Sequence, residues 1–141
     1  IGKAPKKSKL NKLIDDLNLK DRVTFKSGMT EEEIVNIYHT SDIAVIPSLY
    51  EGFGFGAGEA MACGIPLIST DAGGLKQVIG DSAIKIKAGS VEEIEEGILK
   101  LFTEETRRKE LSEKGRQRME ELFDWKIAAK AYVNLFERII N

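Results

Sequence analysis

The middle of the chain, residues 43–74, carries two short apolar runs separated by a glycine-rich stretch. Residues 43–47 and 65–69 are apolar at most positions, as expected for strands that are buried on both faces of a parallel sheet. Between them lie a glycine-rich loop over residues 52–56 and a helix-like segment over residues 58–63. Strand, loop, helix and strand in this order predict a βαβ unit, and such units place their ligand site at the carboxyl end of a strand.

The residues before this unit predict a helix, a strand and a second helix. Residues 5–19 have leucine and isoleucine at helical spacing, opposite lysines and aspartates. Residues 22–26 alternate in the manner of a strand, and residues 27–29 form its exit loop. Thr30 and Glu33 have the spacing of a capping box, which opens a helix. The apolar stripe of that helix is expected to consist of Ile34, Ile37 and Tyr38.

The residues after the unit predict a short helix over 75–79, a last strand over 83–86 and a longer helix. A second capping box, formed by Ser90 and Glu93, opens that longer helix. Its inward-facing residues are expected to be Ile94, Ile98, Leu101 and Phe102.

Two more helices are predicted at the end of the sequence. Residues 104–122 are highly charged, so this helix is expected to be mostly solvated. Asp124 is placed to cap the final helix, and Trp125 at its start is interpreted as a packing anchor. The final helix has a broad apolar stripe made of Ala128, Ala131, Tyr132, Leu135, Phe136, Ile139 and Ile140.

Four strands that alternate with helices predict an α/β fold, a Rossmann-like parallel sheet with helices on both faces. The 141 residues are enough for one domain with a real core and too few for two large ones. A hydrophobic content of 42% is typical of a globular protein and argues against disorder.

The charge and the cysteine content argue against two further classes of protein, those that bind nucleic acid and those stabilised by disulfides. A formal net charge of −2 argues against nucleic-acid binding, which usually requires a basic surface. A single cysteine, Cys63, excludes an internal disulfide framework and fits a reducing compartment. No apolar run reaches the length of a spanning helix and no signal peptide is visible, so we expect a cytoplasmic protein.

The glycine loop indicates phosphate binding. Of the 13 glycines in the chain, eight lie between Gly52 and Gly80. Glycine lets the backbone approach a ligand closely and turn tightly. At the helix start, the amides of Phe55, Gly56 and Ala57 would face an anion that the helix dipole attracts. The alternative is that these glycines only make tight turns.

Two acids flank the loop, with seven residues between them. Glu51 lies where no structural role demands a carboxylate, and it could accept hydrogen bonds from sugar hydroxyls. Glu59, in the following helix, could bind both hydroxyls of a ribose, or it could simply favour a helix N-terminus. Glycoside hydrolysis also uses paired carboxylates, but a loop built for an anionic substrate disfavours that chemistry.

Four further residues are of types that could act in a site. His39 is the only histidine, and a surface or cap position is preferred to a role as general base. Cys63 is interpreted as a small buried apolar residue. Asp71 follows a strand on the ligand side, but turn-making is the preferred role, and Lys76 is preferred as an ordinary helix residue.

Glu51 and Glu59 match the E-x7-E signature, and the chain resembles the C-terminal, donor-binding domain of the family 4 (group 1) retaining glycosyltransferases. Residues 22–54, 59–81 and 123–139 carry the likeness. The resemblance implies the GT-B fold and transfer of a hexosyl group from a UDP, GDP or ADP sugar to a hydroxyl acceptor. It also implies that the enzyme uses neither a metal nor a cofactor.

The resemblance assigns roles by position. Glu51 is the catalytic residue and binds hydroxyls of the transferred sugar. Glu59 binds the ribose hydroxyls. Gly28 and Met29 are expected to lie near the base. The loop that binds the sugar and the diphosphate consists of Glu51, Gly52, Phe53, Gly54, Phe55 and Gly56.

The chain departs from the family pattern at two places. Residues 55–58 read Phe-Gly-Ala-Gly, where the family usually has hydrophobic residues, and each extra glycine loosens the helix start by roughly 0.5–1 kcal/mol against alanine. The family's first strand–helix unit, with its diphosphate-binding arginine and lysine, should precede Ile1, as should the N-terminal acceptor domain. Lys3, Lys6 and Lys7 do not match those cations by position.

Three expectations follow from this reading of residues 1–141 as a donor-binding domain without its first unit. The chain alone should not be a competent transferase, because the diphosphate leaving group lacks its cations. A second chain, the missing domain or self-association should complete the sheet. The parent enzyme is expected to be cytoplasmic, with peripheral association at the membrane as the alternative. The alternatives are a non-catalytic nucleotide-binding or interaction module and, more weakly, a sugar-nucleotide epimerase.

Overall fold

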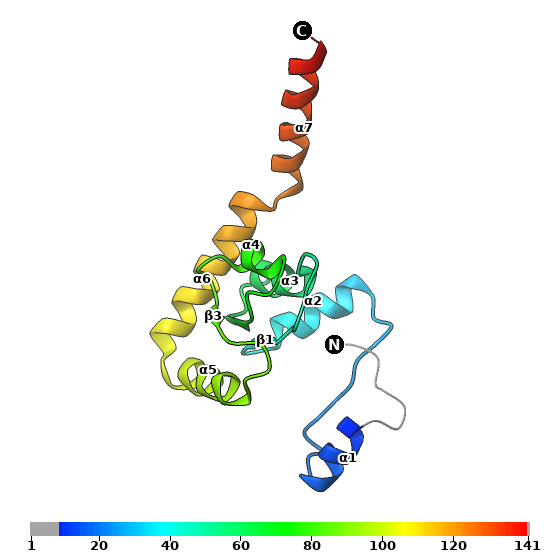
Figure 1. The fold of residues 1–141 in the computed structure, drawn as a ribbon, viewed down its shortest axis with the longest axis vertical. Helices are drawn as coiled ribbons and strands as arrows, with labels where there is room; N and C mark the ends of the chain where they lie inside the picture. Colours follow the sequence, from blue (N-terminus) through cyan, green and yellow to red (C-terminus); the bar gives the residue numbers. More distant parts are fainter. Residues whose placement is uncertain (1–8, 141) are drawn as a thin grey trace. The chain divides into compact units, whose positions relative to one another are not determined.

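The computed structural model describes residues 9–140, which divide between Ile34 and Val35 into two compact units (Figure 1). The start of the predicted first helix, residues 5–8, lies outside the described residues, as do Lys3, Lys6 and Lys7. Each unit is described by itself below.

The first unit contains helix α1, Lys9–Asp16, in which only Ile14 is buried. The predicted strand over residues 22–26 is wrong, because these residues form no strand. The N–H groups of Arg22 and Val23 instead donate to the carbonyl oxygen of Leu19, at 2.9 and 3.1 Å, which makes a turn. A strand needs a neighbour to receive its backbone hydrogen bonds, and local alternation does not supply one.

Helix α2, Glu31–His39, begins in the first unit and ends in the second. Its predicted capping box is confirmed in both directions. The Thr30 N–H donates to the Glu33 carboxylate at 2.8 Å, and the Glu33 N–H donates to the Thr30 hydroxyl oxygen at 3.3 Å. The predicted apolar stripe is only half-buried.

The second unit is built on a parallel sheet of three strands, β1 Ala44–Ile46, β2 Leu67–Ser69 and β3 Ile84–Lys85. They lie in the order β1-β2-β3, with Val45 opposite Ile68 and Ile68 opposite Ile84. The predicted parallel α/β sheet is therefore confirmed with three of its four strands. β2 is fully buried, whereas β1 is half-buried because among residues 9–140 it pairs on one side only.

Helices connect and follow these strands. α3, Phe55–Ala62, joins β1 to β2, and α4, Leu75–Ile79, joins β2 to β3. After β3 the chain forms α5, Val91–Thr103, α6, Glu105–Leu122, and α7, Trp125–Ile140 (Figure 1). Among the described residues, no helix has both the length and the apolar character that a membrane span requires.

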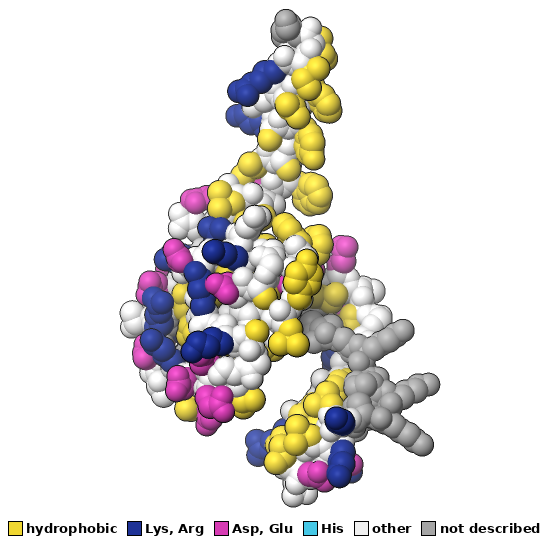
Figure 2. Space-filling model, in the orientation of Figure 1, with side chains coloured by type: hydrophobic (Ala, Val, Ile, Leu, Met, Phe, Trp, Pro, Cys, Tyr) yellow, Lys and Arg dark blue, Asp and Glu magenta, His cyan; other side chains and the backbone are white. Residues whose placement is uncertain are grey.

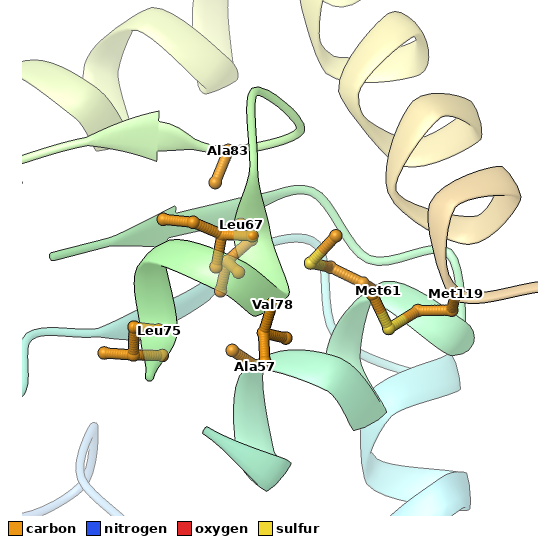
Figure 3. Packing of buried hydrophobic residues seen from close by; sticks show 8 residues of the cluster. Ala57, Met61, Leu67, Leu75, Val78, Ala83 and Met119 are labelled. Atoms are coloured by element: carbon orange, nitrogen blue, oxygen red, sulfur yellow. The ribbon is translucent and has the colours of Figure 1, made fainter. Parts of the chain in front are cut away.

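One core cluster covers the face of the sheet to which Leu67 points (Figure 3). Met61 of α3 and Met119 of α6 close it at one end, and α4 contributes Leu75 and Val78. Leu67, Met61 and Leu75 are almost fully buried, so this cluster fixes α3 and α4 against the strands that position the candidate site.

A second cluster covers the opposite face. Ile68, adjacent to Leu67 in β2, packs there with Leu101 of α5 and Leu111 of α6. A Cβ at Gly97 of α5 would lie 3.2 Å from Ile68, so glycine allows α5 to approach the sheet closely. Because successive strand residues point to opposite faces, the two clusters confirm helices on both faces of the sheet.

The predictions for α5 need two corrections. Phe102 and Ile98 do not face inward, since they are 74% and 39% exposed. The buried positions are Gly97 and Leu101, and Gly97 gave no hydrophobic signal. The Ser90 hydroxyl accepts from the Glu93 N–H at 3.2 Å as predicted, but the Glu93 carboxylate accepts from the Lys87 N–H instead of completing the box.

Helix α7 begins as predicted, because the Asp124 carboxylate accepts from the Lys126 N–H at 2.7 Å. Its apolar stripe is exposed apart from Ala128, which is half-buried (Figure 2). Trp125 is 86% exposed, so its interpretation as a packing anchor is wrong. The prediction that α6 is mostly solvated is confirmed, since only Leu111, Gly115 and Met119 are buried.

Candidate functional site

The carboxyl ends of β1 and β2 lie at the same edge of the sheet, and buried hydroxyls hold their exit loops together. The Thr70 hydroxyl donates to the carbonyl oxygen of Ser48 at 2.8 Å, and the Thr70 N–H donates to that of Ile46 at 3.2 Å. Thr70 is 2% exposed. Two loops that are more than twenty residues apart in sequence thus form one surface, which is where open parallel sheets bind ligands.

A pair of glycines brings these loops into backbone contact. The Gly74 N–H donates to the carbonyl oxygen of Glu51 at 2.9 Å. A Cβ at Gly73, whose φ is +59°, would collide with that carbonyl oxygen, and a Cβ at Gly74 would collide with the carbonyl oxygen of Gly52. Neither glycine was predicted to have a role, although two adjacent glycines after a buried strand are a signal of close approach.

Gly54 ends the loop and caps helix α3. Its φ of 100° lies in the left-handed region, and a Cβ there would lie 2.7 Å from the Leu75 side chain. The N–H groups of Ala57 and Gly58 donate to its carbonyl oxygen at 3.1 and 3.0 Å. The helix therefore begins at Phe55, three residues before the predicted start, because Ala57 is fully buried and holds the first turn in place.

The first turn of α3 offers a site for an anion. Within the described part of the chain, no backbone carbonyl accepts from the N–H groups of Phe55 or Gly56. Unpaired amides at a helix start, together with the positive end of the helix dipole, attract phosphate and carboxylate groups.

Glu51 lies beside this turn. The residue is half-buried, and its Cγ would lie 3.7 Å from a Cβ at Gly54. The rings of Phe53 and Phe55 pack against each other at 4.8 Å, and the Phe53 ring lies 6.0 Å from that of Phe123. The Phe53 and Phe55 side chains thus contact other aromatic rings. A polar ligand would therefore bind the backbone of the loop rather than these side chains.

Glu59 is exposed on α3 and has a partner that the sequence analysis missed. The Tyr38 hydroxyl lies 3.3 Å from Glu59 Oε2 and 3.2 Å from the carbonyl oxygen of Gly56. Burial, and then the Glu59 carboxylate, raise the pKa of Tyr38 to about 12. The sequence placed Tyr38 in an apolar stripe, and no local pattern connects a residue of α2 to Glu59.

Cys63 follows Glu59 by one helical turn. It is half-buried rather than buried, so the prediction for it was only partly right. Burial raises the pKa of the thiol, the Glu59 carboxylate raises it further, and Arg116 acts in the opposite direction. The Glu59 carboxylate therefore raises the pKa of both the Tyr38 phenol and the Cys63 thiol.

The structure does not gather the other candidates into this site. His39, Asp71 and Lys76 are exposed. Gly28 and Met29 belong to the first unit, and their role near a base stays a prediction. Residues 9–140 contain no group of three His, Cys, Asp or Glu side chains placed to hold a metal ion.

An apolar groove of about 710 Å³ adjoins the site. Its walls come from α3, the end of α6 and the start of α7, and Glu59 is one of its few charged residues. Its aromatic surface comes from Phe53, Phe55, Phe123 and Trp125.

Comparison with known proteins gives a consistent result. The family described as "Glycosyl transferases group 1" matches residues 1–118. The "MMP alpha-(1->4)-mannosyltransferase" of Mycolicibacterium hassiacum is 35% identical over 132 residues, which are 92% of this chain and 32% of that protein. The "D-inositol 3-phosphate glycosyltransferase" of Mycolicibacterium smegmatis is 42% identical over 72 residues, 51% of this chain and 17% of that protein.

Solved structures show the same likeness. A sucrose-phosphate synthase from Thermosynechococcus elongatus superposes with a TM-score of 0.85 at 28% identity, over 99% of this chain and 37% of that one. The C-terminal domain of a group 1 family glycosyl transferase from Francisella tularensis superposes with a TM-score of 0.72 at 26% identity, over 81% of this chain and 60% of that one. The chain spans about a third of the mannosyltransferase and about a sixth of the inositol-phosphate enzyme.

Proposed function

This chain belongs to the group 1 glycosyltransferases and has the α/β architecture of their GT-B fold, and from that premise we propose that it is the donor-binding part of a retaining enzyme. The enzyme transfers a hexosyl group from a nucleoside-diphosphate sugar to a hydroxyl acceptor. Residues 1–141 form the donor-binding domain, and the acceptor is bound by another domain or chain.

The start of α3 carries this proposal. Gly54 caps the helix in a left-handed conformation, and within the described residues no backbone carbonyl accepts from the N–H groups of Phe55 and Gly56. A diphosphate seated there would receive backbone hydrogen bonds and the favourable end of the helix dipole without any metal. Gly52 and Phe53 extend the same loop toward the transferred sugar.

The two acids bind the neutral parts of the donor. Glu51, which lies beside Gly54 at the start of the helix, accepts hydrogen bonds from hydroxyls of the sugar and is the catalytic residue. Glu59 lies one helical turn further along α3 and accepts hydrogen bonds from the ribose hydroxyls. In this arrangement the diphosphate lies between them.

A nucleotide-binding experiment tests the proposal. We expect UDP, GDP or ADP, added without metal, to raise the melting temperature of the chain, because a ligand that binds only the folded state stabilises it. In the Glu59→Ala variant the rise should be lost. Glu96→Ala, which removes an exposed acid of α5, is the matched control and should leave the rise intact. A shift by none of the three nucleotides would contradict the proposal.

One observation favours a second candidate, a non-catalytic nucleotide-binding module. Departure of a nucleoside diphosphate needs cationic stabilisation. The arginines of α6 are engaged within the domain: Arg116 pairs with Glu120 at 2.9 Å, and Arg118 donates to the carbonyl oxygens of Val78 and Gln77. We expect the chain alone to bind nucleotide without transferring sugar. Release of hexose from an NDP-sugar by the chain alone would refute this expectation.

A further inference from the structure

We propose that Tyr38 is a positioning residue for the donor site: its hydroxyl, which also contacts the first turn of α3, holds the Glu59 carboxylate in the arrangement that binds the ribose. This inference rests on the proposed function and adds a residue of helix α2 to it. The observation is the contact of one phenol oxygen with two parts of α3.

The geometry supports a shared hydrogen bond. The Tyr38 hydroxyl lies 3.2 Å from the carbonyl oxygen of Gly56 and 3.3 Å from Glu59 Oε2. A tyrosine hydroxyl has one proton to donate, so the two acceptors share it or exchange it. Both distances are long for an O–H donor, so each contact is a weak hydrogen bond.

Tyr38 contacts the two elements that a nucleotide would use. Gly56 provides one of the unpaired N–H groups at the start of α3, and Glu59 lies one turn later on the same helix. A Cβ at Gly56 would lie 3.8 Å from the Tyr38 hydroxyl and 3.7 Å from Ile46, so the phenol and β1 border this turn together. The hydroxyl therefore links the anion-binding turn to the carboxylate.

An exposed glutamate needs such a partner to bind a diol well. Glu59 is solvent-exposed, and its side chain loses rotamer freedom when both carboxylate oxygens accept from ribose hydroxyls. A half-buried phenol that already restrains the carboxylate reduces this loss before the ligand arrives. The ring remains anchored in α2, so removal of the hydroxyl alone should leave the packing in place.

The competing explanation is that Tyr38 only ties α2 to α3. A purely structural tie would change the stability of the protein, and it would weaken all nucleotides equally. Positioning of Glu59 predicts a selective loss, confined to ligands that carry ribose hydroxyls. The two explanations therefore differ in a measurable way.

The test compares ribonucleotides with their 2′,3′-dideoxy counterparts. Affinities of UDP, GDP and ADP, and of the dideoxy forms, are measured by calorimetry for the wild type, Tyr38→Phe, Glu59→Gln and the double variant. We expect Tyr38→Phe to weaken the preferred ribonucleotide about three- to tenfold, the effect of one lost hydrogen bond, and to leave its dideoxy form unchanged. In the Glu59→Gln background the same change should have little further effect.

Tyr50→Phe is the matched control, because Tyr50 is 81% exposed and the substitution removes the same atom. It should leave both affinities unchanged. Equal weakening of the ribo and dideoxy forms by Tyr38→Phe, or no weakening at all, would overturn the inference. Failure of the proposed function gives a different result, in which the wild type binds no nucleotide or Glu59→Gln leaves the ribose preference intact.

A spectroscopic measurement keeps the inference testable if Tyr38→Phe does not fold. In a Tyr50→Phe, Tyr132→Phe background, 3-fluorotyrosine labels Tyr38 alone, since the chain has three tyrosines. We expect the fluorine resonance to move when the ribonucleotide binds and to move less with the dideoxy form. The same shift with both ligands would show that the phenol does not respond to the ribose contact.

Discussion

The backbone N–H of Gly74 donates a hydrogen bond to the carbonyl oxygen of Glu51 at 2.9 Å, which joins the loop after β2 to the loop after β1. This contact holds the glycine loop in place, because the backbones of residues 51–53 and 73–74 pack directly against each other. The candidate site thus depends on two glycines that contact the loop through their backbones.

We expect Gly73→Ala and Gly74→Ala to destabilise the domain by roughly 1–3 kcal/mol each, because each new Cβ meets a backbone carbonyl that cannot move without shifting the loop. Urea unfolding measures the change in the free energy of unfolding. Gly52→Ala is the control in the same loop, since a Cβ there meets nothing within 4 Å. If all three variants unfolded alike, the close contact would not matter for stability.

The glycines inside α3 should behave in the opposite way. Neither Gly56 nor Gly58 has a positive φ, and a Cβ at either meets only ordinary contacts. We expect Gly58→Ala to raise the free energy of unfolding by roughly 0.5–1 kcal/mol, because alanine loses less backbone entropy in a helix. Urea unfolding beside Gly74→Ala gives the comparison. A destabilised Gly58→Ala would mean that the helix start is strained.

The raised pKa of Tyr38 should make the stability of the protein depend on pH. Its pKa is raised from 10.0 to about 12, so the folded state holds the phenol proton more tightly than the unfolded chain does. This contribution is fully present below pH 10 and is lost as the pH rises toward 12. We expect the free energy of unfolding to fall more steeply between pH 10 and about 12 in the wild type than in Tyr38→Phe. Tyr50→Phe should retain the steep fall.

The reactivity of Cys63 should report on Glu59. Burial and the Glu59 carboxylate raise the pKa of the thiol, so less thiolate is present at a given pH. We expect iodoacetamide to alkylate Cys63 more slowly than a free thiol at pH 8, more quickly in Glu59→Gln and more slowly still in Arg116→Gln. Because Cys63 is the only cysteine, mass spectrometry follows it without interference. Equal rates in all three proteins would contradict the coupling.

Self-association is expected from the exposed apolar stripe of α7. Leu135, Phe136 and Ile139 are each at least half exposed, and β1 has an unpaired edge among residues 9–140. We expect sedimentation velocity to show a second copy binding as concentration rises. Leu135→Lys with Ile139→Lys should abolish this association, whereas Val91→Lys, an exposed apolar residue at the start of α5, should not. A wild type that stays monomeric would refute the prediction.

The sequence by itself determined the features that depend on nearby residues. Thr30 and Glu33 cap their helix as predicted, Asp124 caps α7, and the apolar runs around Val45 and Ile68 form adjacent parallel strands. These signals are strong because the interacting groups lie within a few residues of one another or because full burial demands apolar side chains on both faces. The predicted membership of the group 1 glycosyltransferases is likewise confirmed.

Tertiary structure alone decided what distant residues do to one another. Residues 22–26 have the pattern of a strand but form none, since alternation cannot supply a neighbouring strand. Identical glycines have opposite roles: Gly74 permits a backbone contact with Gly52, whereas Gly58 is an ordinary helix residue. The contact of Tyr38 with Glu59 joins residues 21 positions apart, and only the packing of α2 beside α3 could create it. Local sequence encodes local hydrogen bonds, but close approach between segments is fixed by how the whole core packs.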